Sequence, residues 1–373
     1  MMKHEVTYCK ALAIMLMVLG HSCGDGMLYV TQTIYMFHMP LFFFLSGFCF
    51  KEKYLTSTGT FVFRRFKGIW WPYVKWSLIF LFCHNLFVSI HFYGADCGAQ
   101  SNDGLYYAPE YLVRIFDILF DMSGHEQLLG GYWFMHALLW GALIAYMIIY
   151  FSNRIKARYP VTYGYFIDVV CVGVLLGLMM FTNEYMRCYV GVLFPRTLMA
   201  AIFFFLGRLF STYGVRKFRW WQSVLAFSLV IYGGFHWRLE PANYFYQGQT
   251  LQIPLYICTA LLGIWVMYSL PWTLVKEESM FSKVINYIGN NTLTILTWHF
   301  VCFKLVAFVL IRIYHLPEYY LTMFPVISEY SDKGWWVAYF LIGVTLPLLS
   351  LLLINRLCQS IGNRKWMMGN KNN

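Results

Sequence analysis

The sequence predicts an all-α polytopic membrane protein, with about ten transmembrane helices forming one domain over residues 1–373. Of the 373 residues, 60% are apolar and only 12% are charged, whereas a soluble domain is about half apolar and about a quarter charged. Stretches such as 12–20, 34–50 and 337–354 contain no Asp, Glu, Lys or Arg. Since a helix needs about 20 mostly apolar residues to cross a bilayer, this chain has room for about ten spans and short loops.

Each predicted span is an apolar run bounded by loop residues. The first run contains Lys10 and has no small-residue cleavage site after Gly20, so we interpret it as a retained helix rather than a signal peptide. No linker leads to a soluble domain, so none is expected beyond the last helix. The expected spans are 6–22, 31–50, 68–92, 132–151, 163–182, 195–211, 220–237, 250–270, 289–313 and 335–355.

The distribution of Lys and Arg predicts the orientation of these helices. If both termini are cytoplasmic, every inner loop holds more basic residues than the outer segments do, as the positive-inside rule requires. The longest outer loop, 92–131, contains Glu126 and is suited to a lid or a glycan-contacting surface. The inner basic residues include Lys51, Lys53, Arg64, Arg65, Lys67, Arg154, Lys156, Arg158, Arg216, Lys217 and Arg219.

The net charge of +11 follows from this topology and from attraction to anionic membrane lipid, so it does not indicate a nucleic-acid partner. The ten cysteines lie mostly within apolar runs without CxxC spacing. They are more typical of small buried apolar residues than of a metal site, and no metal is expected.

Ionisable residues within apolar spans often face a protein interior or an aqueous cavity and frequently mark function. The first span holds Lys10 and His21. In a helix, that separation corresponds to about 16 Å and leaves the two side chains about 20° from the same face. Alternatively, Lys10 extends to the headgroups and His21 is an interfacial residue at a helix end.

The second span places His38 shortly before Pro40 and ends with Ser46 and Gly47. A proline inside a span leaves a backbone carbonyl without its helical partner and kinks the helix, which is a common way to shape a cavity. Small residues such as Ser46 and Gly47 allow another helix to approach closely, and packing alone would also explain them.

Arg64, Arg65 and Lys67 precede the aromatic residues that open the third span. Positive-inside anchoring explains basic residues at this place. A guanidinium cluster is also suited to a phosphorylated cytoplasmic cosubstrate, because arginine binds phosphate bidentately.

Five patterns then occur in order along the chain. Lys10 and His21 are separated by ten positions, and the residues between Phe37 and Phe48 join His, Met and Pro to a Phe-rich Leu-Ser-Gly-Phe string. The others are Arg64-Arg65 before Pro72-Tyr73, the Trp133-Phe134 step, and the run 288–293 followed by His299.

With these patterns the chain resembles the acyltransferase-3 family of integral membrane acyltransferases, which includes many bacterial O-acetyltransferases acting on surface glycans. Two positions depart from the family pattern. Gly68 stands where the family commonly has a further Arg, with Lys67 one position earlier, and Thr292 replaces the usual Ser while keeping a hydroxyl.

The resemblance implies an O-acyltransferase, most commonly an O-acetyltransferase, in the bacterial inner membrane. It would take an acyl group from cytoplasmic acyl-CoA, most often acetyl-CoA, to a hydroxyl of an extracytoplasmic glycan or lipid-linked saccharide. Intramembrane charges and a Pro-kinked helix also suit a transporter or flippase for a lipid-linked sugar, or a sensor without turnover. The acceptor and the oligomeric state are left open by the sequence.

The resemblance also implies roles for individual residues. His21 is expected to act as general base or as a transient acyl carrier, with Lys10 and His299 as further catalytic residues. Lys10, Arg64, Arg65 and Lys67 are expected to hold the phosphates or pantetheine of CoA. His38, Asn291 and His299 are candidates for orienting His21 or for stabilising the oxyanion, and Trp133 and Glu126 for contacting the acyl group or the acceptor.

Overall fold

The structure is a computed structural model, and it describes most of the chain. Outside the description lie residues 1–2, 95–98, 100, 102, 160–162, 192, 215, 237–238, 240–247, 271–274, 276–277 and 370–373. Residues 3, 193 and 360–369 are described by their backbone alone. In the described ranges the secondary structure is helical, without a β-strand, as the composition predicted.

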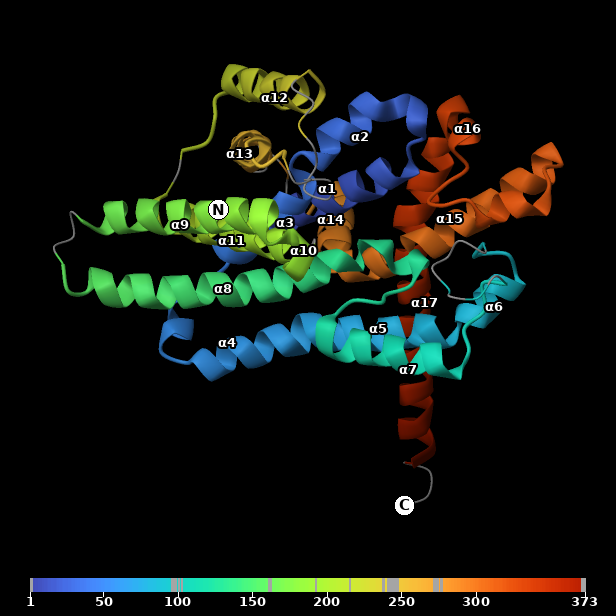
Figure 1. The fold of residues 1–373 in the computed structure, drawn as a ribbon. Helices are drawn as coiled ribbons and strands as arrows, with labels where there is room; N and C mark the ends of the chain where they lie inside the picture. The colour runs from blue at the N-terminus through green and yellow to red at the C-terminus, as the bar shows by residue number, and fades with distance from the viewer. Residues whose placement is uncertain are drawn as a thin grey trace.

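The first half of the chain forms a long helix, a broken pair of helices and a group of shorter ones (Figure 1). Its elements are α1 (Lys3–Ser22), η1 (Asp25–Met27), α2 (Leu28–Tyr35), α3 (His38–Phe48), η2 (Glu52–Leu55), α4 (Thr58–Arg65), the π-helix η3 (Phe66–Trp70), α5 (Trp71–Phe82), α6 (His84–Ser89), α7 (Ala108–Phe116), the π-helix η4 (Asp117–Asp121) and η5 (Gln127–Tyr132).

The second half consists mainly of long helices, and the last of them extends beyond the others in Figure 1. These elements are α8 (Trp133–Lys156), α9 (Gly164–Tyr185), α10 (Arg187–Val190), α11 (Leu193–Tyr213), α12 (Trp220–Phe235), α13 (Gln252–Ser269), α14 (Met280–Asn290), α15 (Thr292–Tyr314), η8 (Glu318–Thr322), α16 (Ser328–Tyr330), the π-helix η9 (Ser331–Trp335) and α17 (Trp336–Gly369).

Seven helical segments in the described ranges are long and apolar enough to cross a membrane. The chain is therefore a multi-pass membrane protein, but the expected count of about ten spans is not confirmed. The spans expected at 6–22, 68–92 and 220–237 account for the difference. Helix α1 carries charged residues near its start, α5 has only 12 residues, and α12 has only 16.

The second expected span is interrupted, as its proline suggested, but the break lies before the proline. Helix α2 ends at Tyr35, and Phe37 adopts a non-helical conformation before α3 begins at His38. Pro40 has no N–H, so it cannot bond to the carbonyl of Met36, four residues earlier. The break thus coincides with the carbonyl that the proline leaves without its helical partner.

The third expected span begins earlier than residue 68. Helix α4 continues through the π-helix η3 into α5 without leaving the helical conformation, since Arg65 and Trp70 both have helical backbone angles. Extra residues in a π turn are accommodated as a local bulge, which is frequent at functional sites. Arg64 and Arg65 therefore lie within a helix and are the last two residues before its irregular turn.

Helices α1 and α11 form the centre of the bundle. Helix α1 packs against α3, α14, α15 and α17. Helix α11 packs against α3, α8 and α9, and these four helices lie together in Figure 1. The run Leu198–Phe205 on α11 is buried on all sides, with each side chain at most 1% exposed. A helix that is apolar and buried all round is typical of the interior of a helical bundle.

Two glycines allow α3 and α11 to approach closely. A Cβ atom at Gly47 would lie 1.8 Å from the carbonyl oxygen of Phe204, and one at Gly207 would lie 2.0 Å from that of Phe44. Both distances are far below a van der Waals contact, so only glycine fits at either position. The prediction that Gly47 admits a neighbouring helix is confirmed, and small residues are the usual means of such contact in membranes.

We predict that Gly47→Ala separates α3 from α11 and lowers the free energy of unfolding by about 1–3 kcal/mol or more, the usual cost of overpacking. Thermal unfolding of the detergent-solubilised protein measures this change. The control is Gly59→Ala on α4, where an added Cβ meets no atom within 4 Å. Equal melting temperatures for the two variants would contradict the prediction.

Candidate functional site

A cavity of about 480 Å³ lies between α1, α3, α4, α8 and α15, and we call it the Lys10 cavity. Three basic residues line it, and no Asp or Glu occurs among its described lining residues. The lining residues are Lys10, Ile14, Met17, Met39, Phe42, Leu45, Ser46, Cys49, Phe50, Tyr54, Phe61, Arg64, Arg65, Gly68, Ile69, Phe134, Met135, Leu138, Thr292, Leu293 and Leu296.

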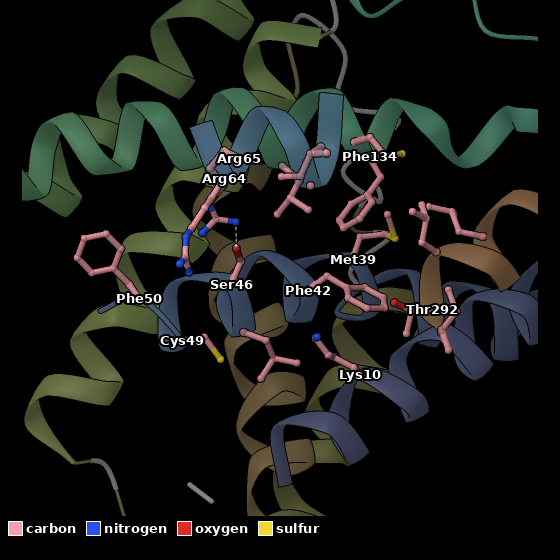
Figure 2. A pocket seen from close by; sticks show the side chains of 18 of the residues that line it. Lys10, Met39, Phe42, Ser46, Cys49, Phe50, Arg64, Arg65, Phe134 and Thr292 are labelled. Carbon is pink, nitrogen blue, oxygen red and sulfur yellow. Dashed lines mark hydrogen bonds between the residues drawn. The ribbon is translucent and has the colours of Figure 1, made fainter. Parts of the chain in front are cut away.

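Arg65 is held against the wall of this cavity by polar and aromatic contacts. Its Nη1 donates a hydrogen bond to Oγ of Ser46 at 2.8 Å, a contact drawn in Figure 2. Its guanidinium carbon lies 5.0 Å from the ring centre of Phe61 and 5.3 Å from that of Phe204. Cation–π contacts of this kind fix a guanidinium without neutralising its charge.

The other basic residues reach the cavity from different helices. Arg64 donates to the hydroxyl of Tyr54 at 3.2 Å, and Lys10 enters from α1 on a separate side of the cavity (Figure 2). Lys67 is exposed and does not line the cavity. The structure thus brings together Lys10, Arg64 and Arg65 but leaves Lys67 apart from them.

A second cavity, of about 390 Å³, contains His21, and we call it the His21 cavity. It lies between α1, α2, α3, α13 and the segment from η5 into α8. Its lining residues are Met17, His21, Tyr35, His38, Met39, Gly130, Gly131, Trp133, Arg196, Tyr256, Phe300, Phe324 and Pro325.

Three imidazole rings converge beside this cavity. The ring centre of His21 lies 5.6 Å from that of His299 and 5.0 Å from that of Phe300. His299 itself lies behind the cavity wall, and its Nδ1 bonds to the carbonyl oxygens of Ile295 and Leu296, each at 3.0 Å. Because a carbonyl only accepts hydrogen bonds, Nδ1 of His299 carries a proton, and in the neutral form of the ring Nε2 keeps a lone pair.

His38 is fixed in the same way. Its Nδ1 donates to the carbonyl oxygen of Ile34 at 2.8 Å, so Nε2 of the neutral ring is an acceptor. The ring of Tyr35 contacts the rings of both His21 and His38 on the cavity wall. Its hydroxyl lies 3.5 Å from Nδ1 of His21 and 3.1 Å from the carbonyl oxygen of Gly20. His21 therefore faces the cavity with neighbours that hold its position on several sides.

The His21 cavity also contains polar residues that the sequence analysis did not select. Arg196 lies with its guanidinium carbon 4.9 Å from the ring centre of Trp133, and Tyr256 lines the same space. Burial, together with the positive charge of Arg196, lowers the pKa of His125, in the loop before η5, to about 4. Arg196 lies in an expected span, so the rule that ionisable residues within apolar runs often mark function would have selected it.

Asn291 and Glu126 lie away from His21. The amide of Asn291 donates to the carbonyl oxygen of Tyr287 at 2.8 Å, where α14 meets α15, and the following Thr292 and Leu293 line the Lys10 cavity. Neither Asn291 nor Glu126 lines the His21 cavity.

Glu126 instead forms a buried ion pair in the loop before η5. Its Oε2 lies 2.7 Å from Nδ1 of His84, and both side chains are at most 1% exposed. Nε2 of His84 bonds to the carbonyl oxygen of Gly104 at 2.9 Å. The carbonyl oxygen of Gly104 can only accept, so Nε2 of His84 carries a proton, and an ionised Glu126 accepts a second hydrogen bond from Nδ1, which makes the two side chains an ion pair. The ring also stacks on Tyr106 with centres 3.4 Å apart, so the pair fastens the loop 103–107 to α6.

Comparison with known proteins gives one match. A family model described as an acyltransferase domain matches residues 3–355, which is nearly the whole chain. No match was found among curated proteins or among solved structures.

We predict that Glu126→Gln lowers the free energy of unfolding by about 3–5 kcal/mol, because it leaves the charge of His84 buried without its counter-ion. Thermal unfolding in detergent measures the change. The control is Glu318→Gln, whose carboxylate lies 4.0 Å from Arg312 in a pair with both side chains more than 60% exposed, and such pairs contribute about 0–1 kcal/mol. A Glu126→Gln protein as stable as the control would overturn the assignment of a buried ion pair.

Proposed function

Since the chain belongs to the acyltransferase-3 family and is therefore a membrane acyltransferase, we propose that it moves an acyl group from cytoplasmic acyl-CoA to an extracytoplasmic hydroxyl. The acceptor in this proposal is a glycan or a lipid-linked saccharide, and the acyl group is acetyl. The proposed location is a bacterial inner membrane with both termini in the cytoplasm. The family match does not favour the alternative of a transporter or flippase.

The observation that supports the proposal most strongly is the arrangement of two different cavities along one helix. Lys10 and His21 lie on nearly the same face of α1, about 16 Å apart, and each lines its own cavity. One cavity offers basic residues without a carboxylate in its described lining, and the other offers an imidazole. This arrangement matches a donor with phosphate groups at one end and a thioester at the other.

The Lys10 cavity provides the donor site in this proposal. Lys10, Arg64 and Arg65 supply positive charge for the phosphates, and arginine can bind them bidentately. The wall between these residues and Met17 is mostly apolar, which suits the pantetheine arm. Lys67, which is exposed and outside the cavity lining, attracts the anionic donor in this proposal through long-range charge rather than through direct contact.

The transfer step requires a base for the hydroxyl proton and donors for the developing oxyanion. In direct transfer, the acceptor oxygen attacks the thioester carbon while His21 takes its proton. The C–O bond forms, the C–S bond breaks, and the proton passes to the CoA sulfur. In the acyl-carrier route, a nitrogen of neutral His21 attacks the thioester carbon, the C–N bond forms as the C–S bond breaks, and the ring proton passes to the CoA sulfur. The acceptor oxygen then attacks the acyl carbon, the C–O bond forms as the C–N bond breaks, and the hydroxyl proton returns to the imidazole.

The remaining residues are assigned by position. His38 lines the His21 cavity, and His299 lies behind its wall. In this proposal the two imidazoles hold His21 in place. The hydroxyls of Tyr35 and Tyr256 and the guanidinium of Arg196 are the donors available in the His21 cavity for an oxyanion. Trp133 provides an aromatic face for the acceptor. Asn291 acts at the donor side through the junction of α14 and α15, and Glu126 acts by anchoring the outer loop.

We predict that His21→Ala lowers acyl transfer at least about 100-fold, because either route loses its essential group. Release of the CoA thiol by purified protein in lipid nanodiscs, with membrane glycan added, measures this change. The same variant should leave envelope glycans without the acyl mass when they are compared by mass spectrometry. His4→Ala on the same helix, outside both cavities, is the control, and an active, folded His21→Ala protein would refute the central assignment.

Charge reversal of the arginine pair, Arg64→Glu with Arg65→Glu, should raise the KM for acetyl-CoA about tenfold or more, the size expected when one charge-assisted hydrogen bond is lost. The KM for the acceptor should change much less. Steady-state kinetics with each substrate varied in turn separate the two effects. Arg154→Glu, in which the lost cation contacts Tyr150 outside both cavities, is the control. An unchanged KM for acetyl-CoA would leave Arg64 and Arg65 as topological anchors.

A further inference from the structure

The two cavities meet at a pair of methionines. Met17 of α1 and Met39 of α3 line both the Lys10 cavity and the His21 cavity, and they are the two described residues that the linings share. Both side chains are buried, at 2% and 7% exposure. A group that moves between the cavities where they border each other therefore passes these two side chains.

The position of Met17 on α1 follows from helical spacing. Lys10, Ile14, Met17 and His21 are separated by four, three and four residues, so they form one stripe along the helix. Met17 lies about 6 Å from His21 along the helix axis, at 1.5 Å per residue. It is thus the last side chain on this stripe before the imidazole.

Helix α3 contributes a second stripe to the cavity walls. Met39, Phe42, Ser46 and Cys49 follow one another at helical spacing and line the Lys10 cavity, while His38 lines the His21 cavity. The break at Phe37 sets where this stripe begins. Met39 therefore lies at the end of the Lys10 cavity that borders the His21 cavity.

The choice of methionine matters for what can pass. Methionine is unbranched and has three rotatable bonds, so it closes a gap by packing and opens it by changing rotamer. Such a pair admits a small group easily, whereas a longer acyl chain requires a wider displacement of packed side chains, which dense interiors resist.

We propose that Met17 and Met39 form a constriction between the two cavities that selects the donor by the length of its acyl group. The thioester end of the pantetheine arm passes between the methionines to reach His21, and an acetyl group passes more readily than a longer chain. This inference rests on the proposed acyl-CoA donor and adds the residues that determine donor specificity.

The first test compares acyl-CoAs of increasing length. For wild type, Met17→Ala, Met39→Ala and the double variant, kcat/KM is measured by thiol release with acetyl-, butyryl- and hexanoyl-CoA. We expect the ratio of hexanoyl- to acetyl-CoA to rise at least tenfold in the double variant. Met135→Ala is the matched control, since Met135 is buried and lines the Lys10 cavity alone. An unchanged ratio, or an equal rise in the control, would overturn the proposal.

The second test detects the constriction without turnover. Tyr256→Cys places a thiol in the His21 cavity, and native Cys49 provides one in the Lys10 cavity. Membrane-impermeant methanethiosulfonate reagents are applied to sealed vesicles of either orientation, and modified peptides are identified by mass spectrometry. We expect position 256 to react from one face only, and from both faces when Met17 and Met39 are alanine. Reaction from both faces with the methionines present would show that no constriction exists.

The two tests distinguish failure of this inference from failure of the proposed function. If wild type consumes no acyl-CoA of any length while labelling of position 256 remains one-sided, the donor assignment is wrong and length selection falls with it. If thioester is consumed with an unaltered length profile in the double variant, the acyltransferase assignment remains and the methionine constriction is rejected.

Discussion

The cost of placing a charge in hydrocarbon determines how this chain is built. Within a bilayer, each polar group must find a partner inside the protein or face water. In the described ranges, several buried charges meet this requirement through pairs, such as Lys156 with Asp168 and His84 with Glu126, and Lys304 donates to two backbone carbonyls. The two arginines of the Lys10 cavity are held instead by hydroxyls and aromatic rings, which do not neutralise their charge.

Two buried basic residues illustrate this difference. Lys304 is 1% exposed, and its ammonium donates to the carbonyl oxygens of Leu321 in η8 and of Met323 just after it. Arg65 is also largely enclosed, but its neighbours include Ser46, Phe61 and Phe204, none of which carries a negative charge. A guanidinium held in this way keeps its positive charge at the cavity wall, which supports the proposed phosphate site.

The sequence predicted the class of fold and the face of α1 that carries Lys10 and His21, because both follow from apolar run length and helical periodicity. It predicted the proline-linked irregularity in the second span but not that the break would fall at Phe37, which depends on packing around α3. Helices α5 and α12 are shorter than the full spans that were expected. Apolar composition alone does not show where a helix ends. Arg196 was not predicted, although it is an ionisable residue within an expected span. Asn291 precedes His299 by about two turns of α15, so its nearness to His299 along the chain does not bring it into the lining of the His21 cavity.

The glycine contact between α3 and α11 has a mechanical consequence. At Gly47 and Gly207 each helix touches the backbone of the other, so no side chain lies between the helices at these two points that could change rotamer and let them slide. The two helices are therefore fixed relative to each other there, and α3 carries Met39, Ser46 and His38 on this fixed unit. If the two cavities open to each other as proposed, the widening has to come from movement of α1 and the helices packed against it.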